Sequence, residues 1–144
     1  MDTSTILMSL QNKLPRKNPL IFTDIKEKFE ALNEGQKRDF VSRIALSKLG
    51  SPTLTFWIGS FLFGAFGVGF FMAGAKKLGF IWLGITIVNI IIASLFVEPG
   101  SVLDKFTTII PTALWVTSMV EAGKILRKNN HEKIMQALEE SKKV

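Results

Sequence analysis

The sequence predicts an all-α fold: a small helical integral membrane protein with two to three transmembrane helices and a short helical N-terminal region. The first observation is Leu54–Ala73, twenty residues without a charge. About 20 apolar residues suffice to cross a hydrocarbon core of roughly 30 Å. A soluble helix of that length normally has a polar face, which this segment lacks. The second observation is that two more apolar segments follow, and the third is that charge is concentrated at the chain ends.

The charge distribution divides the chain into three parts. Residues 1–53 carry nine Lys/Arg and six Asp/Glu, and residues 121–144 carry six and four. Basic flanks beside apolar spans are typical of cytoplasmic segments, and they favour anionic lipid headgroups. No nucleic-acid reader motif accompanies the net charge of +6, so the expected partner is the lipid bilayer and not nucleic acid. We therefore expect a cytoplasmic helical region at 1–53, a membrane domain at 54–120 and a basic amphipathic C-terminal helix at 121–144.

The N-terminal region lacks the features of a cleaved signal. A short apolar patch around Ile6 and Leu10 is followed by Pro15 and Arg16, where a signal peptide would have a small-residue cleavage site. The N-terminus is therefore expected in the cytoplasm. The chain contains no cysteine, which excludes disulfides and thiolate metal sites.

Two short helices are expected before the first apolar segment. Thr23 can cap the first, and Asn33 followed by Gln36 resembles a capping box for the second. A hairpin of about 30 residues buries too little area to be stable alone. Its apolar face should dock on the membrane domain, on a second copy or on a partner. That face comprises Ile25, Phe29, Leu32, Phe40, Val41, Ile44 and Ala45.

The three apolar segments leave the number of crossings open. Leu54–Ala73 is the clearest, Phe80–Phe96 is shorter, and Phe106–Val120 contains Pro111 and rises only about 23 Å as a helix. Three full crossings would separate the two basic ends, whereas the positive-inside rule places both in the cytoplasm. We expect three apolar helices with the N-terminus inside. The following tail, to about Leu138, is expected to be helical, either in the membrane interface or solvated.

Small residues in the first segment form a candidate helix-packing face. In one continuous helix, Ala65, Gly69 and Ala73 lie on one ridge at a spacing of four, and Gly64 and Gly67 widen it. Such ridges let membrane helices approach closely. The face could form a homo-oligomer seam, or it could pack against the chain's own Phe80–Phe96.

Polar residues within the apolar segments are the other candidates. Asn89 is expected to hydrogen-bond a neighbouring helix. Glu121 lies at the end of the third segment, where it can reach water. Five hydroxyl side chains in the third segment could line a pore with Asn89, or could bond back to their own backbone. They are Thr107, Thr108, Thr112, Thr117 and Ser118.

No catalytic set is recognisable. The single histidine, His131, lies in the polar tail, and no metalloprotease, nucleophile-elbow or phosphate-binding motif is present. We expect no enzyme activity, no metal and no cofactor.

One family resemblance accompanies these patterns. The run Gly64–Gly74, followed by Leu78 and Gly79, resembles the first half of the TM2 domain, approximately G-G-x-G-x-D-R-F-Y-x-G and then G-L-G. The pair Leu114-Trp115 resembles the later I/L-W pair of that family, and Asn130–Leu138 is similar to the tail of small bacterial members.

The chain departs from that family pattern in two respects. The Asp-Arg pair of the family falls on Gly69 and Phe70, and an insertion containing most of Phe80–Phe96 precedes Trp115. The resemblance implies a divergent member in the bacterial cytoplasmic membrane, without catalytic activity.

Together these patterns predict a protein that acts through helix association with itself or with a membrane partner. The alternative is a homo-oligomeric pore, and a third hypothesis is an adaptor or immunity-type protein that binds a membrane partner.

Overall fold

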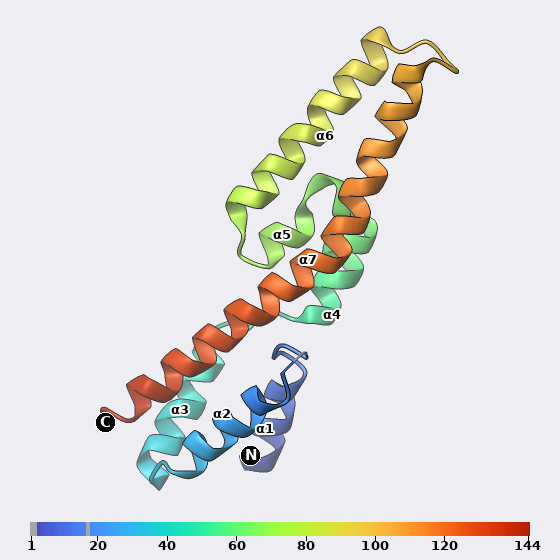
Figure 1. Cartoon of the computed structure of the whole chain (residues 1–144). Helices are drawn as coiled ribbons and strands as arrows, with labels where there is room; N and C mark the ends of the chain where they lie inside the picture. Colours follow the sequence, from blue (N-terminus) through green and yellow to red (C-terminus); the bar gives the residue numbers. More distant parts are fainter. Residues whose placement is uncertain (1–2, 17) are drawn as a thin grey trace. The chain divides into compact units, whose positions relative to one another are not determined.

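The computed structural model describes residues 3–16 and 18–144, and all regular elements in them are helical (Figure 1). The chain forms two compact units. Unit 1 comprises residues 1–52 and 127–144, and unit 2 comprises residues 53–126. The long helix α7, Val102–Ser141, contributes to both.

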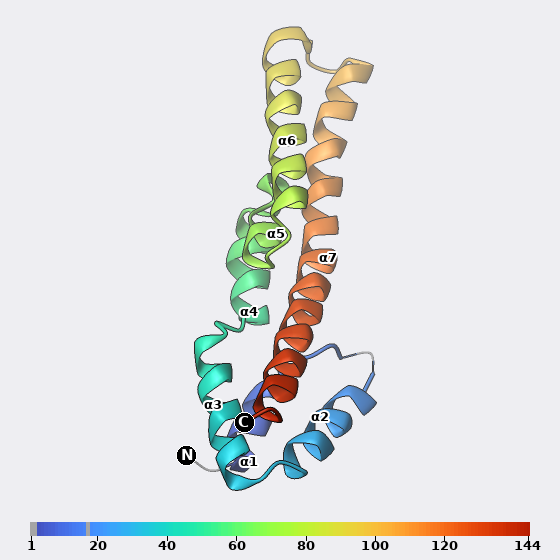
Figure 2. The ribbon, with the colours of Figure 1, turned by 90° about the vertical axis from the view of Figure 1, so that its left-hand side faces the viewer.

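Unit 1 is built from α1 (Thr3–Gln11), α2 (Leu20–Glu30), α3 (Glu34–Leu46) and the C-terminal part of α7. Figures 1 and 2 show the C-terminal turns of α7 beside the N-terminal helices. The C-terminal part of α7 therefore packs on the N-terminal helices, and its apolar face is buried because it completes the core of unit 1. Residues of this core include Leu10, Ile25, Phe29, Phe40, Ile134 and Leu138, all no more than 1% exposed.

The two expected N-terminal helices are present, with one difference. The capping box is confirmed: the Gln36 amide donates to Asn33 Oδ1 at 2.9 Å, and the Asn33 amide donates to Gln36 Oε1 at 3.1 Å. Helix α2 begins at Leu20 and not after Thr23. Its first amide, that of Leu20, donates to Asn18 Oδ1 at 3.1 Å. This N–H at the start of the helix therefore has a hydrogen-bond acceptor without Thr23.

Leu54–Ala73 is not one helix, so the prediction that it forms a single continuous apolar helix is wrong. It contains the end of α4 (Pro52–Leu54), a π-helix η1 (Thr55–Leu62), a 3₁₀ turn η2 (Gly64–Phe66) and α5 (Val68–Met72). Gly67 adopts φ +75°, a left-handed conformation that glycine reaches without steric cost.

Helix α5 returns along η1 after this reversal. A Cβ atom on Gly59 of η1 would lie only 2.7 Å from Gly69 Cα in α5. The backbones approach this closely because both positions are glycine. The first apolar segment is therefore a folded-back helical hairpin.

Among the described residues, two helices are long and apolar enough to cross a membrane: α6, Lys76–Phe96, and α7, whose N-terminal part belongs to unit 2. They lie side by side in both views. Only 17% of each apolar window is buried, the opposite of a soluble core helix. The expected short third segment, Phe106–Val120, is part of α7, which continues through Pro111.

Candidate functional site

In unit 2, η1 packs against α7 through two serine side chains. Ser60 Oγ donates to the Ser118 carbonyl at 3.0 Å, and the two hydroxyl oxygens lie 3.3 Å apart. Both side chains are buried, at 1% and 0% exposure. Next to them, Trp115 Nε1 donates to the Phe61 carbonyl at 2.7 Å. Ser118, a candidate pore residue, is thus enclosed where η1 meets α7.

The glycines of the predicted helix-packing face lie close to other residues of the same chain. A Cβ on Gly64 would meet Trp115 at 3.0 Å, and one on Gly67 would meet the Gly79 carbonyl oxygen at 2.8 Å. Ala73 is buried at 2% exposure, and the Ala65 carbonyl accepts a hydrogen bond from Thr86 Oγ1 at 2.5 Å.

These positions do not form the continuous face that was expected, because Gly67 interrupts the helix between Ala65 and Gly69. A Cβ on Gly69 would overlap Ser60 Oγ and lie 3.1 Å from Ala122 Cβ. Within the chain, Ala65 and Gly67 contact α6, whereas Gly64 and Gly69 contact α7.

Asn89 joins the two long helices. Its Nδ2 donates to the Thr107 carbonyl at 3.0 Å, and the residue is 7% exposed. Pro111 has no N–H, so the Thr107 carbonyl four residues earlier lacks its usual helical donor. Asn89 supplies that donor, which explains how α7 continues through Pro111. The expected bond from Asn89 to a neighbouring helix is confirmed.

Three of the hydroxyl candidates bond back to their own helix. Thr107 Oγ1 contacts the carbonyls of Leu103 and Asp104 at 3.1 and 3.0 Å. Thr108 Oγ1 donates to the Asp104 carbonyl at 2.9 Å, and Thr112 Oγ1 to the Thr108 carbonyl at 3.1 Å. Thr117 is exposed. Some members of the set are buried and others face outward, so they do not share one surface within a single chain.

A shallow apolar groove of about 430 Å³ runs along α6, which we call the α6 groove. Gly84 is one of its lining residues, and a Cβ there would have no neighbour within 4 Å. Asn89 contributes the polar group among the lining residues, and the remaining side chains are apolar. They are Phe80, Ile81, Ile85, Val88 and Ile92 of α6 and Ile110 of α7.

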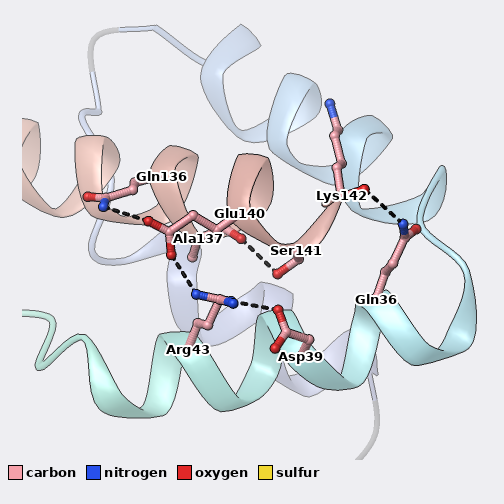
Figure 3. A network of polar contacts seen from close by, with 8 residues as sticks. All are labelled: Gln36, Asp39, Arg43, Gln136, Ala137, Glu140, Ser141 and Lys142. Atoms are coloured by element: carbon pink, nitrogen blue, oxygen red, sulfur yellow. Dashed lines mark hydrogen bonds and ion pairs between the residues drawn. The ribbon is translucent and has the colours of Figure 1, made fainter. Parts of the chain in front are cut away.

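A polar network in unit 1 connects α3 to the end of α7 (Figure 3). Arg43 donates from Nε to Asp39 Oδ2 at 2.6 Å and from Nη1 to Glu140 Oε2 at 2.5 Å. Gln136 Nε2 donates to Glu140 Oε1 at 2.8 Å. The hydrogen bond from Arg43 holds the pKa of Asp39 below its ordinary value, and the same bond raises the pKa of Arg43.

Asn130 of α7 is the residue that the sequence pattern did not single out. Its Nδ2 donates to the carbonyls of Lys13 and Gly50 at 3.2 and 3.0 Å, and its Oδ1 accepts from the Gly50 amide at 3.0 Å. The side chain is 1% exposed. Arg127 adds bonds to the carbonyls of Asn12 and Leu14 at 2.6 and 2.9 Å. The only signal in the sequence was an amide near the apolar face of a helix.

Asp39→Asn is expected to weaken the dependence of unit 1 stability on acidic pH. Because the folded pKa of Asp39 is lowered, its ionised form stabilises unit 1 above the ordinary carboxyl pKa, about 3.9. That contribution is lost as pH falls through the lowered pKa. Hydrogen exchange of α3 amides, corrected for intrinsic rates, should therefore change less on acidification in the variant. An identical pH profile in both proteins would contradict this role.

Among residues 3–16 and 18–144, no group of three or more His, Cys, Asp or Glu side chains could hold a metal ion. Glu121 is paired with Lys124 at 2.5 Å and is partly exposed, so it is not an isolated buried carboxylate. No protein-family model matches the chain, and comparisons with curated proteins and with solved structures give no match.

Proposed function

We propose that this chain is a non-enzymatic integral membrane protein that crosses the bilayer twice and acts through helix association, with itself or with a membrane partner. The observation that carries the proposal is the outward apolar surface of α6 and α7. Phe80, Leu95 and Phe106 are 64%, 69% and 58% exposed. In water such a surface would be unfavourable, whereas in a bilayer lipid tails or another helix cover it.

The proposed topology has both chain ends in the cytoplasm. Ser60 contacts Ser118, and Phe61 contacts Trp115, so η1 and α7 run antiparallel and residues 53 and 126 leave unit 2 at the same end. Lys76 begins α6 near that end, because α5 has returned along η1. Every Lys and Arg except Lys105 then belongs to that side, as the positive-inside rule requires.

The TM2-domain resemblance is part of this proposal, together with a place in the bacterial cytoplasmic membrane. Two separate parts of the resembling pattern meet in space: the position of a Gly64 Cβ lies 3.0 Å from Trp115. This contact supports the resemblance as a packing pattern. The hydroxyl set does not favour the pore alternative, since Thr107, Thr108 and Thr112 bond to their own backbone.

Single-cysteine labelling tests the topology, and the chain has no native cysteine to interfere. In intact cells, a membrane-impermeant maleimide is expected to label Gly100→Cys in the α6–α7 loop. Lys48→Cys and Lys143→Cys should react only after permeabilisation. Labelling of Lys143→Cys from outside, with Lys48→Cys protected, would mean an odd number of crossings and would refute the proposal.

A further inference from the structure

Asn89 has an amide oxygen with no hydrogen-bond donor among the residues that the structure describes. Its nitrogen is used by the Thr107 carbonyl, and the residue is 93% buried. Among the described residues, no side-chain oxygen is both fully buried and without a hydrogen-bond partner. The Asn89 amide oxygen is therefore partly accessible from outside the protein. Asn89 lines the α6 groove, and the other residues that line it are apolar.

We propose that the α6 groove binds α7 of a second copy of this chain, with the Thr108 hydroxyl donating to Asn89 Oδ1. This inference rests on the two-span membrane topology proposed above and specifies which surface associates. An unpaired amide oxygen in hydrocarbon is costly, so the occupant of the groove must be apolar and must supply one donor.

Depth in the membrane identifies the donor. A second copy inserted with the same topology places each residue at the same depth as in the first. Because Asn89 bonds the Thr107 carbonyl, Thr108 of any other copy lies at the depth of Asn89. Thr108 is exposed on α7, and the neighbouring Ile109 is 60% exposed and supplies the apolar contact.

The two surfaces lie on opposite sides of the α6–α7 hairpin. On α7, Ile110 lines the groove, and Thr108 is rotated from it by about 160° at 100° per residue. A copy therefore offers its groove on one side and Thr108 on the other. Such a contact is head-to-tail and continues to a third copy until a ring closes.

The donor and the space that the contact needs are both present. Thr108 Oγ1 now donates to the Asp104 carbonyl, which also accepts from Thr107 Oγ1 at 3.0 Å, so that carbonyl keeps a partner when Thr108 turns away. On the other side of the contact, Gly84 lines the groove and leaves open space there.

Disulfide cross-linking between two singly substituted proteins tests the contact. Copies carrying Val88→Cys, a groove position about 1.5 Å from the depth of Asn89, and copies carrying Thr108→Cys are co-expressed with different tags and oxidised in native membranes. A cross-link between the two tags is expected. The matched control is Ile90→Cys, which is 49% exposed on the opposite face of α6 and should not cross-link to Thr108→Cys. A chain carrying both Val88→Cys and Thr108→Cys should give a ladder beyond dimers.

The other outcomes overturn the proposal. Cross-links only between two Val88→Cys copies would mean a symmetric α6–α6 contact. No cross-link from Val88→Cys or from a second groove position, Ile92→Cys, would mean that lipid or a different protein covers the groove. Labelling by a membrane-permeant thiol reagent confirms that each variant is present. The topology experiment is independent, so a two-span result with no cross-link refutes only this inference.

The hydrogen bond itself is tested by Thr108→Val, which keeps the side-chain shape and removes the hydroxyl. Association measured by energy transfer in vesicles is expected to weaken about three- to tenfold, as for other hydrogen bonds between membrane helices. Thr117→Val removes another exposed α7 hydroxyl at a different depth and should leave association unchanged. Equal weakening of association by the two variants would contradict the proposed Asn89–Thr108 hydrogen bond.

Discussion

Gly67→Ala is expected to destabilise unit 2 by about 2–5 kcal/mol. Two effects add. The residue has φ +75°, where a side chain costs about 1–2 kcal/mol. The new Cβ would also lie 2.7 Å from Trp82 Cβ and 2.8 Å from the Gly79 carbonyl oxygen. Backbone atoms of α6 cannot move aside without shifting the helix, so overpacking adds about 1–3 kcal/mol.

Tryptophan fluorescence during denaturation by sodium dodecyl sulfate measures this effect. Trp57, Trp82 and Trp115 all lie in unit 2, so the signal reports that unit alone.

Two glycines serve as controls for the separate contributions. Gly100 has φ +82° but open space around its Cβ, so Gly100→Ala should cost only the conformational strain, about 1–2 kcal/mol. Gly123 is helical with open space, so Gly123→Ala should be neutral or stabilising by up to about 1 kcal/mol. If Gly67→Ala costs no more than Gly100→Ala, the close packing of the turn against α6 is not a determinant of stability.

Leu138→Ala is expected to destabilise unit 1 by about 2–5 kcal/mol, the usual cost of a cavity in a packed core. Leu138 is fully buried among side chains of the N-terminal helices. Its truncation should therefore speed hydrogen exchange in α2 and α3, more than 90 residues away in the sequence.

The control for this variant is Leu46→Ala, because Leu46 is 77% exposed on α3. It should leave exchange in α2 unchanged. The tryptophan signal of unit 2 should stay constant in both variants. Unchanged α2 exchange in Leu138→Ala would mean that the N-terminal helices are stable without the C-terminal turns of α7.

Local patterns in the sequence were sufficient for several elements. The capping box of Asn33 and Gln36 needs only residues three positions apart, and it forms as expected. The apolar run Phe80–Phe96 lies within α6, because length and composition already favour a helix there. Asn89 was expected to bond another helix, since an amide in an apolar span needs a partner. Its actual partner depends on how α6 and α7 are aligned.

The path of Leu54–Ala73 was not predictable in this way. An uncharged run is equally compatible with one long helix and with two short helices that fold back. Gly67 can adopt either helical or left-handed backbone angles, and the packing of Trp82 and Gly79 against it selects the second. The predicted ridge of Ala65, Gly69 and Ala73 required one continuous helix. The chain reverses at Gly67, so that helix does not form.

The sequence by itself determined the helical class, the apolar character of three segments and the basic character of the chain ends. These follow from composition and spacing within short segments. Only the tertiary structure decided that the first apolar segment folds back, that Ile134 and Leu138 complete the core of unit 1, and that Asn89 supplies the donor missing at Pro111. The reason is that apolarity and helical period are properties of a segment, whereas the surface that a side chain covers depends on residues far away in the chain.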